Sequence, residues 1–320
     1  MLKRFKLQIW ILLSLGAILL LVILLPQFLP SYIVILITQS LIYAIAAMSL
    51  DLLLGYLGLA ALGHMAYFTV GAYVTGILSV RYNFGFGSTL FFSIAISAAA
   101  AAALGLLALR ARDVYFLMIT LSIALCEWGL ATRWVSLTGG YNGIVGIPRP
   151  DLGLRWMMQD VLPFYYLILI LFLVCLVFII LLIRSPFGKS LVAIRDSESR
   201  MTVLGYNTWL HKYITYIITA AVAGIAGSLY AYYNGYISPD AATLVHCLKL
   251  VLMVGLGGPG TIVGPIFGAF IITFLENIVS IYTDRWLMVI AAVYFLTAMY
   301  TPKGILGLFK SYQMQGKRKW

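Results

Sequence analysis

Long apolar runs separated by short polar breaks dominate the chain. A helix needs about 20 apolar residues to cross a membrane, and only helices or closed barrels satisfy their backbone hydrogen bonds in lipid. The runs do not alternate between apolar and polar positions as barrel strands do, so they predict helices. The predicted spans are 7–29, 32–50, 53–80, 88–109, 114–135, 162–183, 213–236 and 286–302.

One further apolar stretch, 246–280, is too long for a single helix and too rich in glycine for two ordinary ones. We predict two short helices here, which meet near 255–260 and at Gly264-Pro265. The fold class is therefore all-α: a polytopic membrane helix bundle with about ten crossings, or about eight plus a re-entrant pair. Residues 1–320 form one transmembrane domain in this prediction.

Basic residues set the orientation of such a bundle because they accumulate on the cytoplasmic side. With both termini cytoplasmic, 184–212 is a cytoplasmic loop and 136–162 is a periplasmic one. Six of the 21 basic residues then lie outside or at the outer rim: Arg81, Arg133, Arg149, Arg155, Lys249 and Arg285. All the others lie inside, which supports this orientation. The first span follows Lys3, Arg4 and Lys6, and we interpret it as an uncleaved signal anchor.

The composition agrees with a membrane protein. Hydrophobic residues make up 63% of the 320 residues and the mean hydropathy is +1.02. The net charge of +11 would suit a nucleic-acid partner, but the charges fall in the loops, so we exclude that class. The three cysteines are spaced neither for a metal site nor for a disulfide framework.

The longest polar interruption, 184–207, carries the signals of a short helix. Asp196 and Ser197 are good N-cap residues, Glu198 adds negative charge to the first turn, and Gly205 can end the helix in a left-handed conformation. These signals predict a helix over 198–204, about 10 Å long. A short helix held on the cytoplasmic face is suited to dock into another protein.

Two glycine clusters are candidates for a substrate pathway, because broken helices line transporter sites near the bilayer midplane. The first lies in the third span and surrounds His64, which taken alone is typical of a hydrogen-bonded interior histidine. Asp51 would begin or cap that span. The second cluster lies between the two predicted short helices. The glycines are Gly55, Gly58, Gly63 and Gly71 in the first cluster and Gly255, Gly257 and Gly258 in the second.

Glu127 falls near the middle of the 114–135 span, where an ionisable group is costly and should face the bundle interior with a partner. It is either a pathway residue or part of an interhelical hydrogen bond, with Trp128 or Arg133 as partner. Glu276 and Asn277 are placed at the outer interface. The sequence shows no cluster of charges deep in the membrane. This suits a pathway that passes its substrate along without binding it tightly.

No catalytic pattern is present in the sequence. His64, His211 and His246 belong to different depths and cannot form one metal or catalytic cluster. The 136–162 loop is rich in turn formers, so it is a candidate lid or docking surface, or else a plain connector.

Four segments together give the chain a resemblance to a known family: SLDLLLGYLGLA at 49–60, LTGGYNGI at 137–144, RSPFGKSL at 184–191 and GLGGPGT at 255–261. The chain resembles the membrane permease subunits of bacterial ABC importers for branched-chain amino acids, of the type abbreviated to the letter M. The resemblance covers nearly the whole chain.

The resemblance implies that the short cytoplasmic helix is a coupling helix that enters a groove on an ATPase subunit. Small residues that the family motif has after its acidic position are replaced here by Ser199, Arg200 and Met201. Glu198 and Gly205 match the acidic and glycine positions of the motif. We expect the contact with the ATPase subunit to be made by Arg195, Asp196, Ser197, Glu198, Arg200, Leu204 and Gly205.

The resemblance also implies partners: a second homologous permease, two cytoplasmic ATP-binding subunits, and a periplasmic or lipid-anchored substrate-binding protein. The chain itself would bind no cofactor, since ATP and Mg²⁺ would be used by the ATPase subunits. The complex would lie in the bacterial inner membrane. Branched-chain or other hydrophobic amino acids are the implied substrates. Urea or short amides are the alternative substrates, and an autonomous secondary carrier is the alternative mechanism. A membrane-embedded enzyme is not favoured, because it would need catalytic residues at one depth and the sequence shows none.

Overall fold

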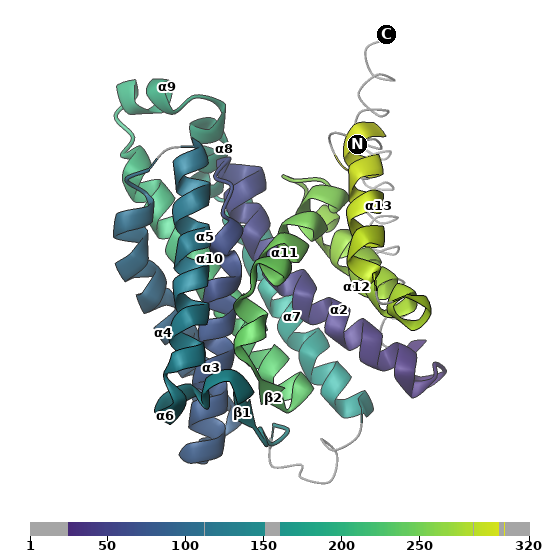
Figure 1. Ribbon diagram of the computed structural model, residues 1–320. Coiled ribbons are helices and arrows are strands. Elements are labelled where there is room, and N and C mark those ends of the chain that lie inside the picture. Colours follow the sequence, from purple (N-terminus) through teal and green to yellow (C-terminus); the bar gives the residue numbers. More distant parts are fainter. Residues whose placement is uncertain (1–24, 112, 151–160, 284, 301–303, 305–320) are drawn as a thin grey trace, which may run out of the picture.

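The computed structural model describes residues 25–111, 113–150, 161–283, 285–300 and 304, and these form a helical bundle (Figure 1). The predicted span 7–29 lies outside the described residues except for its last few, of which Leu25–Gln27 form a 3₁₀ turn, η1. The helices after it are α2 Ser31–Asp51, α3 Met65–Arg81, α4 Phe86–Ala108, α5 Asp113–Arg133, α6 Val135–Thr138, α7 Val161–Arg184, α8 Pro186–Asp196, α9 Glu198–Val203, α10 Thr208–Asn234, α11 Leu244–Gly257, α12 Val263–Tyr282 and α13 Trp286–Tyr300.

Six helices in the described part of the chain are long and apolar enough to cross a membrane. They are Ser31–Leu57, Phe86–Ala108, Val114–Arg133, Val161–Arg184, Thr208–Asn234 and Val263–Tyr282. The predicted all-α membrane bundle is therefore confirmed, whereas the number of crossings and the side on which the termini lie stay predictions. The apolar helix α11 is shorter, with 14 residues.

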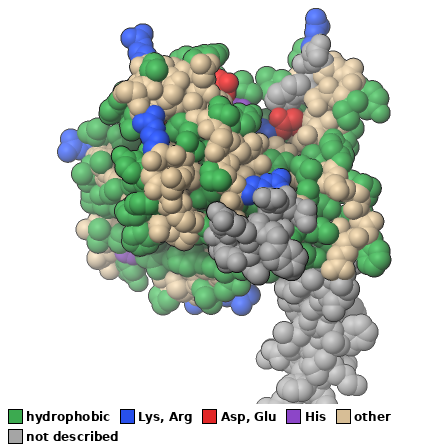
Figure 2. Space-filling view, turned by 90° about the horizontal axis from the view of Figure 1, so that it is seen from below, with side chains coloured by type: hydrophobic (Ala, Val, Ile, Leu, Met, Phe, Trp, Pro, Cys, Tyr) green, Lys and Arg blue, Asp and Glu red, His purple; other side chains and the backbone are tan. Residues whose placement is uncertain are grey.

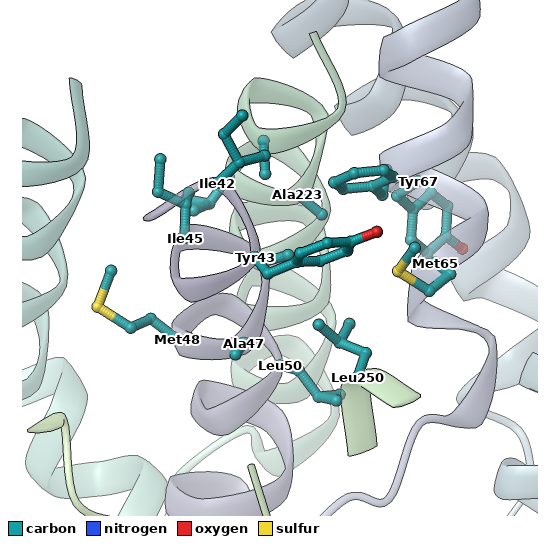
Figure 3. Close-up of a cluster of buried hydrophobic side chains, with 14 of the residues drawn as sticks. Ile42, Tyr43, Ile45, Ala47, Met48, Leu50, Met65, Tyr67, Ala223 and Leu250 are labelled. Carbon is teal, nitrogen blue, oxygen red and sulfur yellow. The ribbon is translucent and has the colours of Figure 1, made fainter. Parts of the chain in front are cut away.

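The α2 helix lies at the centre of the bundle and is the most deeply buried of these six spans. It packs against α7, α10, α11 and α12. Its residues Ile42, Tyr43, Ile45 and Met48 are buried, in a cluster with Leu250 of α11 (Figure 3). This helix therefore touches both parts of the bundle described next.

One part of the bundle consists of α3, α4 and α10, which approach one another through small residues. Ser93 of α4 donates hydrogen bonds to the carbonyl oxygens of Gly71 in α3 (3.1 Å) and Gly224 in α10 (2.8 Å). A Cβ on Gly71 would collide with Gly224. Without a hydrophobic driving force between helices in lipid, such close backbone packing is what holds them together.

The other part contains α11 and α12, the two helices predicted over 246–280. They pack against each other and against α2, and residues Gly258–Ile262 separate them. The predicted break is confirmed, but α12 has 20 residues and is not a short helix.

The predicted third span, 53–80, is wrong as a single helix. The α2 helix continues through Asp51 into a π-helical turn, η2 (Leu52–Leu57), and the chain then leaves helical geometry at Gly58, whose φ is +79°. A 3₁₀ turn, η3 (Leu62–His64), leads into α3. The break falls at Gly58 because this left-handed conformation suits only a residue without a Cβ.

A small ribbon ties two loops together at the end of the bundle opposite α9 (Figure 1). Strand β1 (Ile144–Val145) pairs antiparallel with β2 (Tyr236–Ile237), so that Ile144 lies opposite Ile237. The view from this end, in Figure 2, shows hydrophobic side chains around much of the perimeter, with Lys and Arg side chains standing out at several places. Such an apolar perimeter is what a bilayer requires of a spanning bundle.

Candidate functional site

The segment between α7 and α10 forms two helices at one end of the bundle, which we call the α9 end (Figure 1). The short helix predicted over 198–204 is present as α9. The Ser197 hydroxyl accepts a hydrogen bond from the Arg200 backbone N–H (3.4 Å), and Gly205 has a φ of +87°. Asp196, the other expected cap, is instead the last residue of α8.

Most of α9 is exposed. Met201 is its buried anchor, whereas Val203 and the following Leu204 are 87% and 71% exposed. Glu198 is paired with Lys212 of α10, with 2.6 Å between Oε1 and Nζ. Val203 and Leu204 are thus exposed next to charged residues, and the part of this helix in docking stays a prediction.

Helix α8 was not predicted. Its signals are Ser185, whose hydroxyl accepts from the Gly188 N–H (3.2 Å), and Pro186 at the first helical position. Its buried residues Leu191 and Ile194 lie three apart on one face. Thus α9 is not carried by a loop but by an amphipathic helix packed on the bundle.

Three segments meet where α8 ends, and we call this place the junction. Arg195 Nη1 donates a hydrogen bond to the carbonyl oxygen of Gly55 in η2. Asp51 Oδ1, one turn earlier, accepts from the Gly260 N–H (2.8 Å) in the loop between α11 and α12. A Cβ on Gly58 would lie 2.7 Å from Arg195 Cγ. Asp51 therefore does not begin or cap a helix, as predicted, but holds a neighbouring loop.

The predicted pathway glycines do not share one surface. Gly55 and Gly58 belong to the junction, and Gly258 precedes the junction residue Gly260. Gly63 instead touches the Thr120 carbonyl in α5, and Gly71, a residue of α3, packs against Gly224 of α10. Gly255 and Gly257 belong to the last turn of α11. Most of these glycines make close contacts between elements, and their part in a pathway stays a prediction.

His64 lies in the interior, with Nε2 2.8 Å from the Ser49 hydroxyl oxygen, and Nδ1 has no hydrogen-bond partner among the described residues. Glu127 lies on the inward face of α5, one turn after the buried Ala124. Neither Oε2 of Glu127 nor Nε1 of Trp128 has a partner in the described part of the chain, so Trp128 does not supply the predicted bond.

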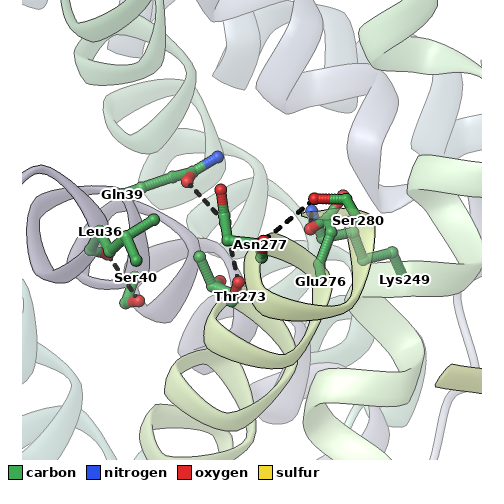
Figure 4. A network of polar contacts seen from close by, with 8 residues as sticks. All are labelled: Leu36, Gln39, Ser40, Lys249, Thr273, Glu276, Asn277 and Ser280. Carbon is green, nitrogen blue, oxygen red and sulfur yellow. Dashed lines mark hydrogen bonds and ion pairs between the residues drawn. The ribbon is translucent and has the colours of Figure 1, made fainter. Parts of the chain in front are cut away.

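An ion pair lies at the other end of α11 and α12, towards the start of α2. Lys249 of α11 is paired with Oε2 of Glu276 in α12 (Figure 4). The Lys249 Nζ also lies 4.5 Å from the centroid of the Tyr43 ring in α2. Lys249 is only 4% exposed. The prediction that the bundle interior holds no charges is therefore wrong, whereas the position of Lys249 at the outer rim stays a prediction. Burial followed because α11 packs into the bundle instead of lying at its edge.

A polar group from a third helix adjoins this pair. Asn277 Nδ2 donates to the Thr273 carbonyl oxygen (2.8 Å) and to Gln39 Oε1 of α2 (3.4 Å) (Figure 4). The Thr273 hydroxyl is buried and has no partner among the described residues. Lys249, Glu276, Asn277, Gln39 and Thr273 are called the charged cluster below.

The fold and these sites define a class: a multi-pass membrane protein with a short exposed helix at one end. A family model described as the branched-chain amino acid transport system / permease component matches residues 32–299. The chain belongs to this family. No solved structure matches the chain.

Curated relatives extend over most of the chain. The permease protein LivM of the high-affinity branched-chain amino acid transport system of Salmonella typhimurium is 28% identical, over 88% of this chain and 73% of its own length. Its counterpart from Escherichia coli is 29% identical, over 84% and 68%. The permease protein LivH of Escherichia coli is 26% identical, over 83% and 91%. The resemblance stated from the sequence is confirmed at the level of the family.

Proposed function

We propose that this chain is the permease subunit of an ATP-driven importer that carries branched-chain or other hydrophobic amino acids across the bacterial inner membrane. Its family membership and the names of its relatives support this proposal. The chain performs no hydrolysis of its own in this proposal. ATP and Mg²⁺ are used by two cytoplasmic ATP-binding subunits.

The other partners follow from the same assignment. A second homologous permease pairs with this chain, and the similarity to both LivM and LivH supports a pair of related subunits. A periplasmic or lipid-anchored binding protein delivers the substrate, and the loop tied down by the β1–β2 ribbon is available to receive it. The contact with the second permease and the contact with the binding protein can each be tested in a binding experiment.

The observation that carries the proposal is the connection between α9 and the interior. α9 follows α8 directly, and Arg195 at the end of α8 bonds to Gly55 in the π-helical turn of the central span. When the ATPase subunits close, they move α9, and α8 moves with it. The Arg195–Gly55 and Asp51–Gly260 bonds then transmit the motion to both broken regions of the bundle.

Affinity purification from native membranes in mild detergent tests the proposal. The expected result is recovery of two ATP-binding proteins and a second permease, and ATP-driven uptake of leucine once the complex is placed in vesicles with its binding protein. Recovery of the chain alone, still able to transport, would instead establish an autonomous carrier. Uptake of urea or short amides without leucine would establish the alternative substrates.

Substitution of α9 separates the mechanisms more sharply. Replacing Glu198 and Arg200 together by alanine should abolish ATP-driven uptake, while leaving the bundle folded, since both are exposed. Lys189→Ala is the matched control because it removes an exposed charge from α8, outside α9. An autonomous carrier would transport normally in both variants.

A further inference from the structure

The charged cluster is costly for a membrane protein to keep. Lys249 and Glu276 have side chains that are 5% and 18% exposed, between helices that lie among apolar neighbours. Removing two charges from water costs several kcal/mol per ion, and hydrophobic residues of similar size are often as stable or more so. Glu276 lies in the candidate span Val263–Tyr282, and an ionisable residue in a membrane span indicates a functional site by default.

The cluster also has unused hydrogen-bonding capacity. The Thr273 hydroxyl is fully buried, yet it has no partner among the described residues, which is uncommon for a buried polar group. Thr273 precedes Glu276 by three residues and Asn277 by four, so the three side chains lie on one face of α12. The unpartnered Thr273 hydroxyl, one helical turn before Glu276, is available to a ligand that enters between the helices.

The arrangement matches one kind of ligand, a zwitterion. Such a molecule carries an ammonium and a carboxylate a few ångströms apart, and the cluster holds one side chain of each opposite sign on facing helices (Figure 4). The apolar contact that the structure gives this pair is the Tyr43 ring of α2, whose centroid lies 4.5 Å from Lys249 Nζ. Glu276 is the more exposed partner, and α12 becomes increasingly exposed towards Tyr282 beyond it.

We propose that the charged cluster is a transit site for the zwitterionic head group of an amino acid. The Glu276 carboxylate receives the substrate ammonium, and the Lys249 ammonium together with the Thr273 hydroxyl receives the substrate carboxylate. The resident ion pair opens as the substrate enters and closes behind it. The net charge of the site stays zero throughout, so no charge is left unpaired in the bundle. The inference rests on the proposed function, because it assigns the substrate of that importer to named residues.

The alternative is a static clip that only fastens α11 to α12. A clip depends on the attraction between the two charges but not on which helix carries which sign. A zwitterion site depends on both, and also on the Thr273 hydroxyl. The two explanations therefore differ in the behaviour of a charge-swapped pair and of a threonine variant.

The experiment uses the complete importer in vesicles with its binding protein in excess, and measures radiolabelled leucine taken up per ATP hydrolysed. In Thr273→Val the shape is kept and no hydrogen bond within the described protein is lost. A transit site predicts that this ratio falls about tenfold, the effect of one hydrogen bond to a charged group, with thermal stability unchanged. Ser280→Ala is the matched control about two turns further along α12, where the hydroxyl bonds only to its own helix.

The swapped pair Lys249→Glu with Glu276→Lys is the second test. Either single substitution should destabilise the complex, and the double substitution should restore its stability and ATP hydrolysis but not leucine uptake. If the swapped pair and Thr273→Val both take up leucine at the unaltered ratio, the transit site is wrong and the ion pair is a clip. If the unaltered importer takes up no amino acid with ATP, the proposed function fails instead, whatever the variants do.

Discussion

The helices α2, α11 and α12 share two polar contact regions, one at each end, and the two are built differently. At the α9 end, the junction uses side chains that bond to backbone: Arg195 to Gly55, and Asp51 to Gly260. At the other end, the contacts between helices in the charged cluster join side chains to side chains: Lys249 to Glu276, and Asn277 to Gln39.

This difference in construction suits two different tasks. A bond to the backbone fixes the position of a segment, so the junction is suited to transmit movement from α8. A contact between ionised side chains can exchange partners without moving the backbone, so the cluster is suited to bind. Substitutions at the two ends should therefore separate coupling from substrate recognition.

The largest effect should follow from leaving one buried charge without its partner. Glu276→Leu leaves the buried Lys249 ammonium without its partner. The free energy of unfolding of the purified chain should therefore fall by about 3–5 kcal/mol. The double variant Lys249→Met with Glu276→Leu should recover nearly all of it, since no charge then remains. A single variant as stable as the double one would mean that Lys249 reaches water or lipid head groups.

A smaller loss of stability is expected when the junction is overfilled. A Cβ on Gly55 would overlap the Gly260 backbone and the Asp51 carboxylate. Gly55→Ala should therefore cost about 1–3 kcal/mol, the usual range for inserting atoms into a packed site, and should reduce the yield of folded chain. Gly87→Ala in α4 is the control, because nothing lies within 4 Å of that position. Equal stability of both variants would contradict the close approach of these segments.

The third effect is on coupling rather than on stability. The Arg195 side chain is 40% exposed, so Arg195→Gln should destabilise the chain by only about 1 kcal/mol. Leucine taken up per ATP hydrolysed should nevertheless fall severalfold, because α8 then loses its hold on Gly55. Measuring hydrolysis and uptake together distinguishes this from a loss of assembly. An unchanged ratio would show that α9 acts on the bundle by another route.

The smallest effect is expected at the cap of α9. Ser197→Ala removes the hydroxyl that accepts from Arg200, and should weaken the local helix by about 0.5–1 kcal/mol with no change in global stability. Ser197→Gly should cost only a few tenths of a kcal/mol, since glycine is a tolerated cap. The affinity of the chain for the purified ATPase subunits, measured by titration, should fall more in Ser197→Ala than in Ser197→Gly. Equal binding by both variants would mean that α9 is ordered by its partner and not by its cap.

Much of the architecture was predictable from apolar runs. The spans 88–109, 114–135, 162–183 and 213–236 correspond to α4, α5, α7 and α10 within a few residues. The short helix at 198–204 was predictable because its cap and its terminal glycine are local signals. These elements depend on nearby residues alone, which is why a single sequence sufficed for them.

The remainder depends on contacts between distant segments. An apolar run does not reveal where a helix breaks, so the 53–80 stretch was read as one span although Gly58 interrupts it. The burial of Lys249 was not predictable, because it depends on the ion pair with Glu276, which lies 27 residues further along the chain. The junction joins residues about 140 and 209 positions apart, a distance that no local pattern records.

The α10 helix connects the opposite faces of the molecule as a single rod. It begins at Thr208, just after α9, and its 27 residues extend over about 40 Å to the strand β2, which holds β1 and its loop. In the proposed importer, the ATPase subunits would press on one end of this rod and the binding protein on the other. Linkage makes any such influence reciprocal. A loaded binding protein that docks outside would thus favour ATPase closure by the same free energy with which closure favours its docking.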